Sequence, residues 1–121
     1  MSKNGTTNST KRKHLSGYRL MWMIVMFDLP VGSKQERKAA SDFRHFLLDE
    51  GFHMAQYSVY YRVMPGKEYI EKYLRGIKSH LPSYGNVNIL SITDKQYENL
   101  ISFNGRKKEP HSTAPKQLTL F

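Results

Sequence analysis

The sequence contains no cysteine, and this absence excludes both disulfide bonds and metal sites built from thiolates. Any bound metal ion must therefore be held by oxygen or imidazole ligands. The histidines do not indicate a metal site, because the five of them form no pair at metal-ligand spacing and no H-E-x-x-H motif occurs. A histidine-centred zinc site is therefore not expected, and carboxylates remain the candidate ligands.

Long apolar runs are also missing. No run of about eighteen apolar residues occurs, and residues 1–17 lack the apolar core of a secretion signal. We therefore expect a cytoplasmic protein that does not enter a membrane. A chain of 121 residues, 39% of them apolar, suffices for one compact domain but not for two domains with separate cores.

Acidic residues are few, since 10 of them face 19 lysines and arginines, which gives a net charge of +9. The excess lies mostly near the two ends: residues 1–17 carry +4, residues 106–121 carry +3, and residues 18–105 carry only +2. Basic segments of this kind either contact the phosphates of nucleic acids or keep a protein soluble. The charge alone does not decide between these two roles.

The first half of the chain predicts a strand followed by a helix. Residues 18–27 are almost all apolar or aromatic, which is typical of a strand at the centre of a sheet, and Pro30 ends it. Ser33 and Glu36 have the spacing of a capping box, so a helix is predicted to begin there. Gly51 is the natural terminator of that helix.

The second half of the chain predicts further strands and a second helix. Residues 52–64 predict two short strands or one bent strand, and residues 68–81 predict an amphipathic helix that Pro82 ends. Residues 87–93 predict another strand, and residues 100–103 are a short apolar run after one helical turn. This order predicts an α+β protein with the ferredoxin-like βαββαβ fold and an additional short C-terminal strand.

The chain divides into four predicted segments. Residues 1–17 form a basic flexible arm, residues 18–105 the ferredoxin-like domain, residues 106–116 a polar linker and residues 117–121 a docking strand. A four-stranded sheet with so many apolar residues leaves a face or an edge uncovered, so we expect a homodimer.

Asp28 is the residue that most needs an explanation, because it is an acid at the point where an apolar strand meets a turn. Its carboxylate could cap the turn through backbone amides. It could also bind Mg²⁺, although one carboxylate is a poor magnesium site unless a two-fold dimer supplies a second copy. The residues alone leave both interpretations open.

Other candidates are weaker. Tyr57, Tyr60 and Tyr61 could stack on bases, but aromatic residues in strands more often pack in a core or a dimer interface, and we expect packing here. The cations expected to contact phosphate are three in the arm and three in the first turns of the helix: Lys11, Arg12, Lys13, Lys34, Arg37 and Lys38.

Three segments together carry a family resemblance: MIVMFDLP, ERKAASDFRHFLLDEGF and QYSVYYRV. They resemble the CRISPR-associated protein 2 family, in the version found beside compact RNA-guided effector systems, and the similarity covers residues 18–105. The resemblance implies a ferredoxin-like homodimer with an acid at the end of the first strand, here Asp28. That acid is assigned in the family to metal-dependent phosphodiester cleavage, so Asp28 is the expected catalytic and metal-binding residue, with Mg²⁺ or Mn²⁺ as cofactor.

The same resemblance implies a role in capturing new DNA spacers. Family members bridge two dimers of the CRISPR-associated protein 1 integrase and bind duplex DNA, and for some members this role does not need the nuclease acid. The expected partners are therefore a second copy, the integrase and double-stranded DNA. RNA is kept as an alternative substrate.

Two further functions are weighed against this one. A ribonuclease toxin resembling virulence-associated protein D would share the fold and the first-strand acid, and an assembly subunit without catalysis would share the partners. An RNA-recognition module is less well supported, because its basic-Gly-aromatic-Gly-aromatic string does not occur.

The last five residues, QLTLF, end the chain on large apolar side chains, and we expect Leu118, Leu120 and Phe121 to dock on a partner as an added strand. The resemblance makes the integrase the expected recipient. The bacterial sliding clamp, which binds QL-x-LF peptides, and the chain's own dimer are the alternatives.

Overall fold

The apolar segment at the start of the domain forms strand β1 (Met21–Asp28), which lies inside an antiparallel four-stranded sheet. This computed structural model describes residues 20–105 and 107–109. β1 begins three residues later than the sequence predicts and includes Asp28 as its last residue.

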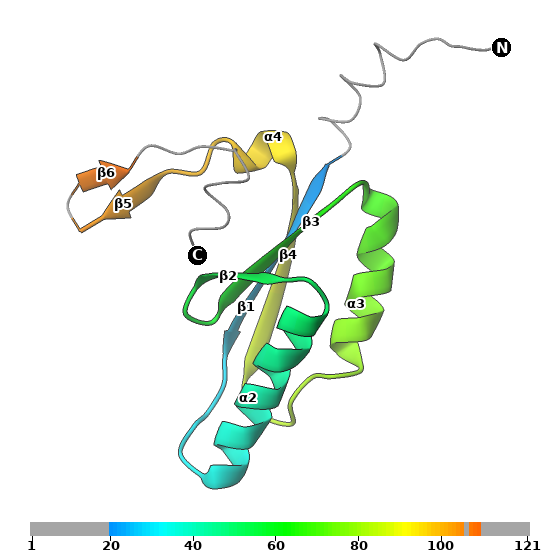
Figure 1. Cartoon of the computed structure of the whole chain (residues 1–121), viewed down its shortest axis with the longest axis vertical. Helices are drawn as coiled ribbons and strands as arrows, with labels where there is room; N and C mark the ends of the chain where they lie inside the picture. Colours follow the sequence, from blue (N-terminus) through cyan, green and yellow to red (C-terminus); the bar gives the residue numbers. More distant parts are fainter. Residues whose placement is uncertain (1–19, 106, 110–121) are drawn as a thin grey trace, which may run out of the picture.

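The sheet has the order β2-β3-β1-β4 (Figure 1). The predicted extended stretch is divided into two strands, β2 (His53–Gln56) and β3 (Val59–Met64), and the last strand of the sheet is β4 (Asn86–Thr93). Every neighbouring pair is antiparallel. With the helices that follow β1 and β3, this order confirms the predicted ferredoxin-like plan.

Helix α2 (Lys34–Asp49) begins at the predicted capping box. The Ser33 hydroxyl accepts a hydrogen bond from the Glu36 amide at 3.1 Å, and the Glu36 carboxylate accepts one from the Ser33 amide at 3.0 Å. The chain leaves the helix through Gly51, whose φ of 90° is in the left-handed region that glycine adopts readily.

The second helix is shorter than predicted. A 3₁₀ turn, η1 (Lys67–Tyr69), leads into α3 (Ile70–Lys78), so the helix stops before the predicted end near residue 81. The reason is local: the Ser79 hydroxyl donates to the Gly76 carbonyl at 2.8 Å and so satisfies one of the last helical acceptors.

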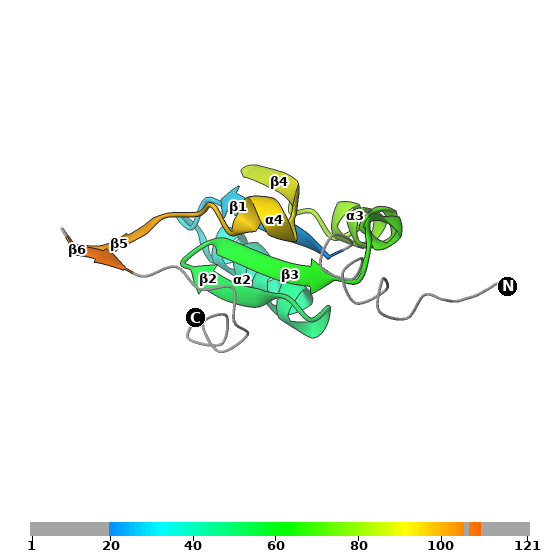
Figure 2. The same cartoon turned by 90° about the horizontal axis from the view of Figure 1, so that it is seen from above.

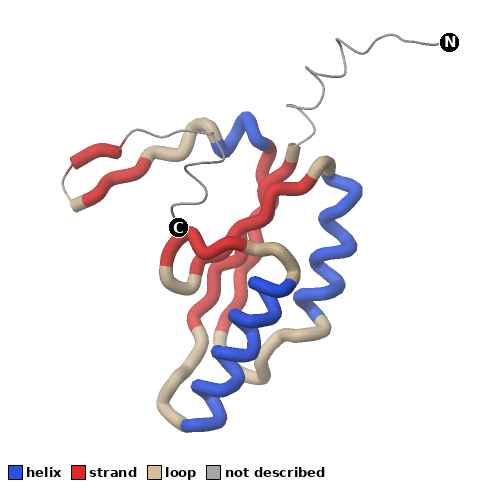
Figure 3. Tube along the Cα trace, in the orientation of Figure 1, coloured by secondary structure: helices blue, strands red, loops and turns tan. Residues whose placement is uncertain are grey.

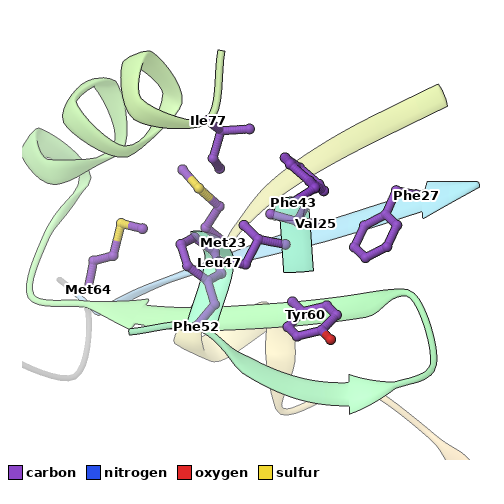
Figure 4. Close-up of a cluster of buried hydrophobic side chains, with 9 residues drawn as sticks. All are labelled: Met23, Val25, Phe27, Phe43, Leu47, Phe52, Tyr60, Met64 and Ile77. Atoms are coloured by element: carbon purple, nitrogen blue, oxygen red, sulfur yellow. The ribbon is translucent and has the colours of Figure 1, made fainter. Parts of the chain in front are cut away.

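The main core lies between one face of the sheet and the helices α2 and α3 (Figures 3 and 4). Alternate residues of β1 point into it, because successive side chains of a strand lie on opposite faces. Its nine buried side chains are Met23, Val25, Phe27, Phe43, Leu47, Phe52, Tyr60, Met64 and Ile77.

The other face of the sheet is covered only in part, by α4 (Asp94–Tyr97). Trp22, Tyr61 and Tyr97 form a small buried cluster there, in which the Trp22 and Tyr97 rings stack with their centroids 3.6 Å apart. The remainder of this face has no covering element within the described residues, and we call it the open face.

Two further strands, β5 (Ser102–Asn104) and β6 (Lys107–Glu109), form a separate hairpin. Figures 1 and 2 show this hairpin extending away from the four-stranded sheet. β6 falls within the stretch that the sequence assigns to a polar linker. None of the described helices has the length and apolar composition needed to cross a membrane.

Candidate functional site

Asp28 lies exposed at the end of β1, between two turns. On one side it pairs with Asn86, the first residue of β4. On the other side, the amide of the preceding residue, Phe27, donates to the carbonyl of Ser58 in the β2–β3 turn at 3.1 Å. The neighbouring strands therefore start where β1 ends, and loops surround the carboxylate.

The side chain of Asp28 makes no hydrogen bond or ion pair within the described residues. The turn after it is held by other groups: the Arg37 guanidinium donates to the Val31 carbonyl at 3.1 Å, and Ser33 and Glu36 cap α2. The alternative in which Asp28 caps this turn therefore gains no support. Its carboxylate is available to a ligand from solution.

The described part of one chain does not provide a complete metal site from side chains. Within the described residues, no group of three histidine, aspartate or glutamate side chains could surround a metal ion. Asp28 does fit the kind of ligand that Mg²⁺ uses, because Mg²⁺ is held by one or two carboxylates together with water and substrate phosphate.

The β4 side of the site is built by the turn that links α3 to β4. Gly85 has a φ of 96°, and a Cβ atom there would lie 2.7 Å from the Asp28 carbonyl oxygen and 2.8 Å from Leu29. Only glycine allows this close approach. The turn therefore rests directly against the end of β1, and its Tyr84 is exposed.

A pocket of about 390 Å³ opens on the helix side of the sheet, next to Leu29, between the β1–α2 loop, the first turns of α2 and the α3–β4 turn. Figure 3 shows these two connections in tan at the same end of the sheet. Sequence analysis missed this pocket and Tyr84. The available signal was an aromatic residue inside the Pro82-Ser83-Tyr84-Gly85 turn, where it has no core to join.

The three predicted helix cations differ in how free they are. Lys34, the first residue of α2, is exposed and makes no ion pair within the described residues. Arg37 is bound to Val31 as described above, and the Lys38 ammonium lies 2.9 Å from the Asp42 carboxylate. Lys34 is thus the cation most available to phosphate at this end of the helix.

Packing is confirmed for two of the three tyrosines around the β2–β3 turn. Tyr60 and Tyr61 are buried on opposite faces of the sheet, and burial raises the pKa of Tyr61 to about 12. Tyr57 does not pack in the core, because it is 76% exposed, and the Arg44 guanidinium donates to its hydroxyl and lies over its ring. Packing of Tyr57 in a dimer interface stays a prediction. A turn residue has no place in the core even when strand residues beside it do.

The predicted arm and tail contacts cannot be placed on this framework. Lys11, Arg12 and Lys13 lie outside the described residues, as do Leu118, Leu120 and Phe121. The site that the structure describes therefore consists of Asp28, its two flanking turns, the pocket and Lys34.

Comparison with known proteins identifies the family. The family model described as CRISPR associated protein Cas2 matches residues 21–100. A protein of Paracidovorax avenae named CRISPR-associated endoribonuclease Cas2 is 53% identical over 88% of this chain and 99% of its own length. Proteins of the same name from Flavobacterium psychrophilum and Ligilactobacillus salivarius are 41% and 43% identical, covering 88% and 83% of this chain and 93% and 100% of their own lengths.

These matches agree with the resemblance carried by β1, α2 and β3, and they decide between the two families considered from the sequence. The matched range begins with β1 and extends beyond α4, so it contains Asp28, both turns beside it and the pocket. The chain belongs to the CRISPR associated protein Cas2 family.

Proposed function

We propose that this chain is a metal-dependent endonuclease whose catalytic residue is Asp28, and that it also serves as a DNA-binding subunit of the complex that acquires new CRISPR spacers. The observation that best supports catalysis is the exposed Asp28 carboxylate, which makes no hydrogen bond to any described residue although it ends an apolar strand. The similar proteins are named endoribonucleases, which makes RNA the first substrate to test and duplex DNA the second.

Asp28 would hold Mg²⁺, or Mn²⁺ in its place, together with Asp28 of a second copy. A two-fold axis repeats the same surface on both copies, so one residue near the axis provides two carboxylates. The bound ion would polarise the phosphodiester group and offset its negative charge. The end of β1 would fix the position of the ion, because it carries Asp28. The Phe27–Ser58 hydrogen bond holds this strand end on one side, and the Gly85 turn holds it on the other.

The open face supports the dimer. Alternation along β1 places Asp28 on the same face as Met26 and Ile24, and Ile24 lies beside Leu90 of β4, which is 48% exposed. A second copy that covers this apolar patch would bring both Asp28 residues to one interface. The segment toward the β5–β6 hairpin also carries exposed apolar side chains, Leu100, Ile101 and Phe103, which a partner could cover.

The spacer-acquisition role is supported by family membership and by charge. The net charge of +9 favours duplex DNA as a ligand, and Lys34, at the start of α2, makes no ion pair with any described residue. The arm cations Lys11, Arg12 and Lys13 would extend this contact. We further propose that residues 117–121 dock on the CRISPR-associated protein 1 integrase by adding a strand to one of its sheets.

Two measurements on Asp28→Asn test the catalytic and assembly roles separately. We expect the variant to lose RNA or DNA cleavage in Mg²⁺ while it still supports spacer acquisition together with the integrase. Loss of acquisition with intact dimers would show that Asp28 is needed for assembly. Cleavage at the wild-type rate would refute the catalytic role.

Deletion of residues 117–121 tests the docking proposal. The shortened chain should no longer elute with the integrase in size-exclusion chromatography, while its own dimer remains. Unchanged co-elution would refute integrase docking. Binding to the sliding clamp that disappears on deletion would favour the clamp instead.

A further inference from the structure

We infer that the side-chain amide of Asn86 binds the phosphate group that is cleaved at Asp28, as a second catalytic residue. This inference rests on the proposed nuclease function and deepens it. It is based on the register between β1 and β4, on the exposure of Asn86 and on the side chains that share its face of the sheet.

Asn86 lies directly opposite Asp28 in the sheet. It is the first residue of β4 and pairs with Asp28, the last residue of β1, and Figure 1 shows these two strands side by side. Residues that oppose each other in an antiparallel pair have Cβ atoms about 4.5–5.5 Å apart and share a face of the sheet. On the other side of β1, the pairing with β3 ends at Met26. Asn86 is therefore the one strand residue opposite Asp28 in the described part of the chain.

Both side chains lie on the open face. Val87 and Ile89 of β4 pack against the main core, and so does Phe27 of β1. Because successive side chains of a strand lie on opposite faces, the residues next to them, Asn86 and Asp28, lie on the other side. The carboxamide and the carboxylate can therefore contact one phosphate group.

The side chain of Asn86 is free, while its backbone is held. It is exposed and makes no hydrogen bond or ion pair to any described residue. The preceding residue, Gly85, approaches Asp28 so closely that a Cβ atom there would lie 2.7 Å from the Asp28 carbonyl oxygen. An exposed amide on a fixed backbone binds a ligand with little further ordering of the chain. Asparagine is also depleted in strands, so strand stability does not account for Asn86.

A phosphate group at Asp28 needs hydrogen-bond donors that the rest of this face does not offer. The strand residues that share the face are Trp22, Ile24, Met26 and Asp28 of β1 and Asn86, Asn88, Leu90 and Ile92 of β4. These two described rows contain no lysine or arginine. Asparagine amides donate to phosphate oxygens in protein–nucleic acid contacts. A donor placed there in advance also stabilises the negative charge on these oxygens during cleavage.

The first test measures binding without metal or cleavage. The full chain carrying Asp28→Asn is titrated in EDTA into a fluorescent twelve-nucleotide single-stranded RNA, and the affinity is read from anisotropy. Adding Asn86→Ala should weaken binding by roughly 3- to 10-fold, because one hydrogen bond to phosphate is lost. Asn86→Asp cannot donate and repels phosphate, so it should weaken binding at least as much. Its side chain has nearly the size of asparagine, so it serves as the second variant if Asn86→Ala does not fold.

Asn88→Ala is the matched control. Asn88 is also an exposed asparagine on the same face of β4, but it lies opposite Met26 rather than Asp28. This variant should bind RNA within about twofold of its Asp28→Asn parent, since it keeps the hydrogen bond of Asn86. Unchanged RNA binding on adding either Asn86 variant would overturn the inference, as would an equal loss with Asn88→Ala.

The second test measures cleavage in Mg²⁺ with Asp28 intact. Asn86→Ala and Asn86→Asp should each lower kcat by about 10²- to 10³-fold, because a donor to the reacting phosphate is lost. Wild-type cleavage by Asn86→Asp would overturn the inference, since a carboxylate there could serve only as a metal ligand. If Asp28→Asn is inactive while Asn86→Ala cleaves normally, only the role of Asn86 is refuted. If Asp28→Asn cleaves normally, the nuclease proposal fails whatever the Asn86 variants do.

Discussion

The indole N–H of Trp22 donates a hydrogen bond to the carboxylate of Asp94 at 2.8 Å, although the two residues are 72 positions apart in the chain. This bond joins the start of β1 to the first turn of α4, and Tyr97 stacks on the same indole ring. It holds α4 on the sheet face that the two long helices leave uncovered. The extent of the open face, and hence of the proposed dimer interface, depends on this contact.

Removing the donor should therefore weaken the domain. Trp22→Phe keeps an aromatic ring against Tyr97 but leaves Asp94 without its partner, and we expect the free energy of unfolding to fall by about 1.5–3 kcal/mol. Urea unfolding followed by circular dichroism measures this change. Asp94→Asn retains an acceptor oxygen, so its free energy of unfolding should fall by less. A Trp22→Phe variant as stable as wild type would show that the bond contributes nothing.

Much of the fold could be predicted from the sequence because its signals are local. The predicted capping box forms as its spacing indicates, at Ser33 with Glu36. A second one, Thr93 with Gln96, begins α4. The order of strands and helices along the chain follows from the apolar patterns. The early end of α3 could not be predicted, because it depends on how the Ser79 hydroxyl competes for a helical carbonyl.

The candidate site was predictable only in part. Asp28 stands out as an acid at the end of an apolar strand, and the structure leaves the side chains of Asp28 and Lys34 exposed. The pocket does not stand out, because its walls come from segments about fifty residues apart that meet only when β4 pairs with β1. The place of Tyr84 in the pocket wall is equally invisible in sequence, since it depends on the Gly85 turn resting on the Asp28 carbonyl.

Stability should fall at alkaline pH. Burial, and secondarily the neighbouring Tyr97, raises the pKa of Tyr61 from its ordinary value of 10.0 to about 12. The folded chain therefore keeps the phenol proton where an unfolded chain loses it. The contribution of Tyr61 to the free energy of unfolding is complete below pH 10. It is lost as the pH rises from 10 through 12, by up to about 1.4 kcal/mol per pH unit.

Tyr61→Phe tests whether Tyr61 causes this alkaline loss of stability, since phenylalanine cannot ionise. Urea unfolding from pH 8 to pH 12 should show a shallower loss of stability in this variant. Burial also raises the pKa of Tyr60 and Tyr97, so some loss should remain. Identical pH profiles for the variant and wild type would be inconsistent with a raised pKa at Tyr61.

The dimer should depend on the open face. Leu90→Lys places a charge in the patch that it forms with Ile24, and burying an unpaired charge is costly, so we expect monomers in sedimentation velocity at micromolar concentration. Leu48→Lys is the control, because Leu48 is 47% exposed, close to the 48% of Leu90, but lies on α2. A wild-type chain that sediments as a monomer would remove the basis of the shared metal site.

Duplex DNA binding should depend on charge and hardly on sequence. The logarithm of the affinity should fall linearly with the logarithm of the salt concentration, with a slope of about −0.9 for each phosphate contact. Deleting residues 1–13 should make this slope less steep, because it removes the arm cations. Fluorescence anisotropy with two unrelated duplexes measures both effects. Affinity that is independent of salt, or a strong preference for one duplex, would argue against backbone contacts.

The central claim is that cleavage takes place at a metal ion shared by two copies of Asp28. The most direct test is the cleavage rate of a mixed dimer, in which one copy is wild type and the other is Asp28→Asn, purified through two different affinity tags. With Mg²⁺ present, we predict strong loss of cleavage in the Asp28→Asn homodimer and a mixed-dimer rate far below half that of wild type, because the ion loses one of its two carboxylates. A mixed dimer at half the wild-type rate would contradict the shared site, and an Asp28→Asn homodimer at the full rate would contradict the catalytic role of Asp28.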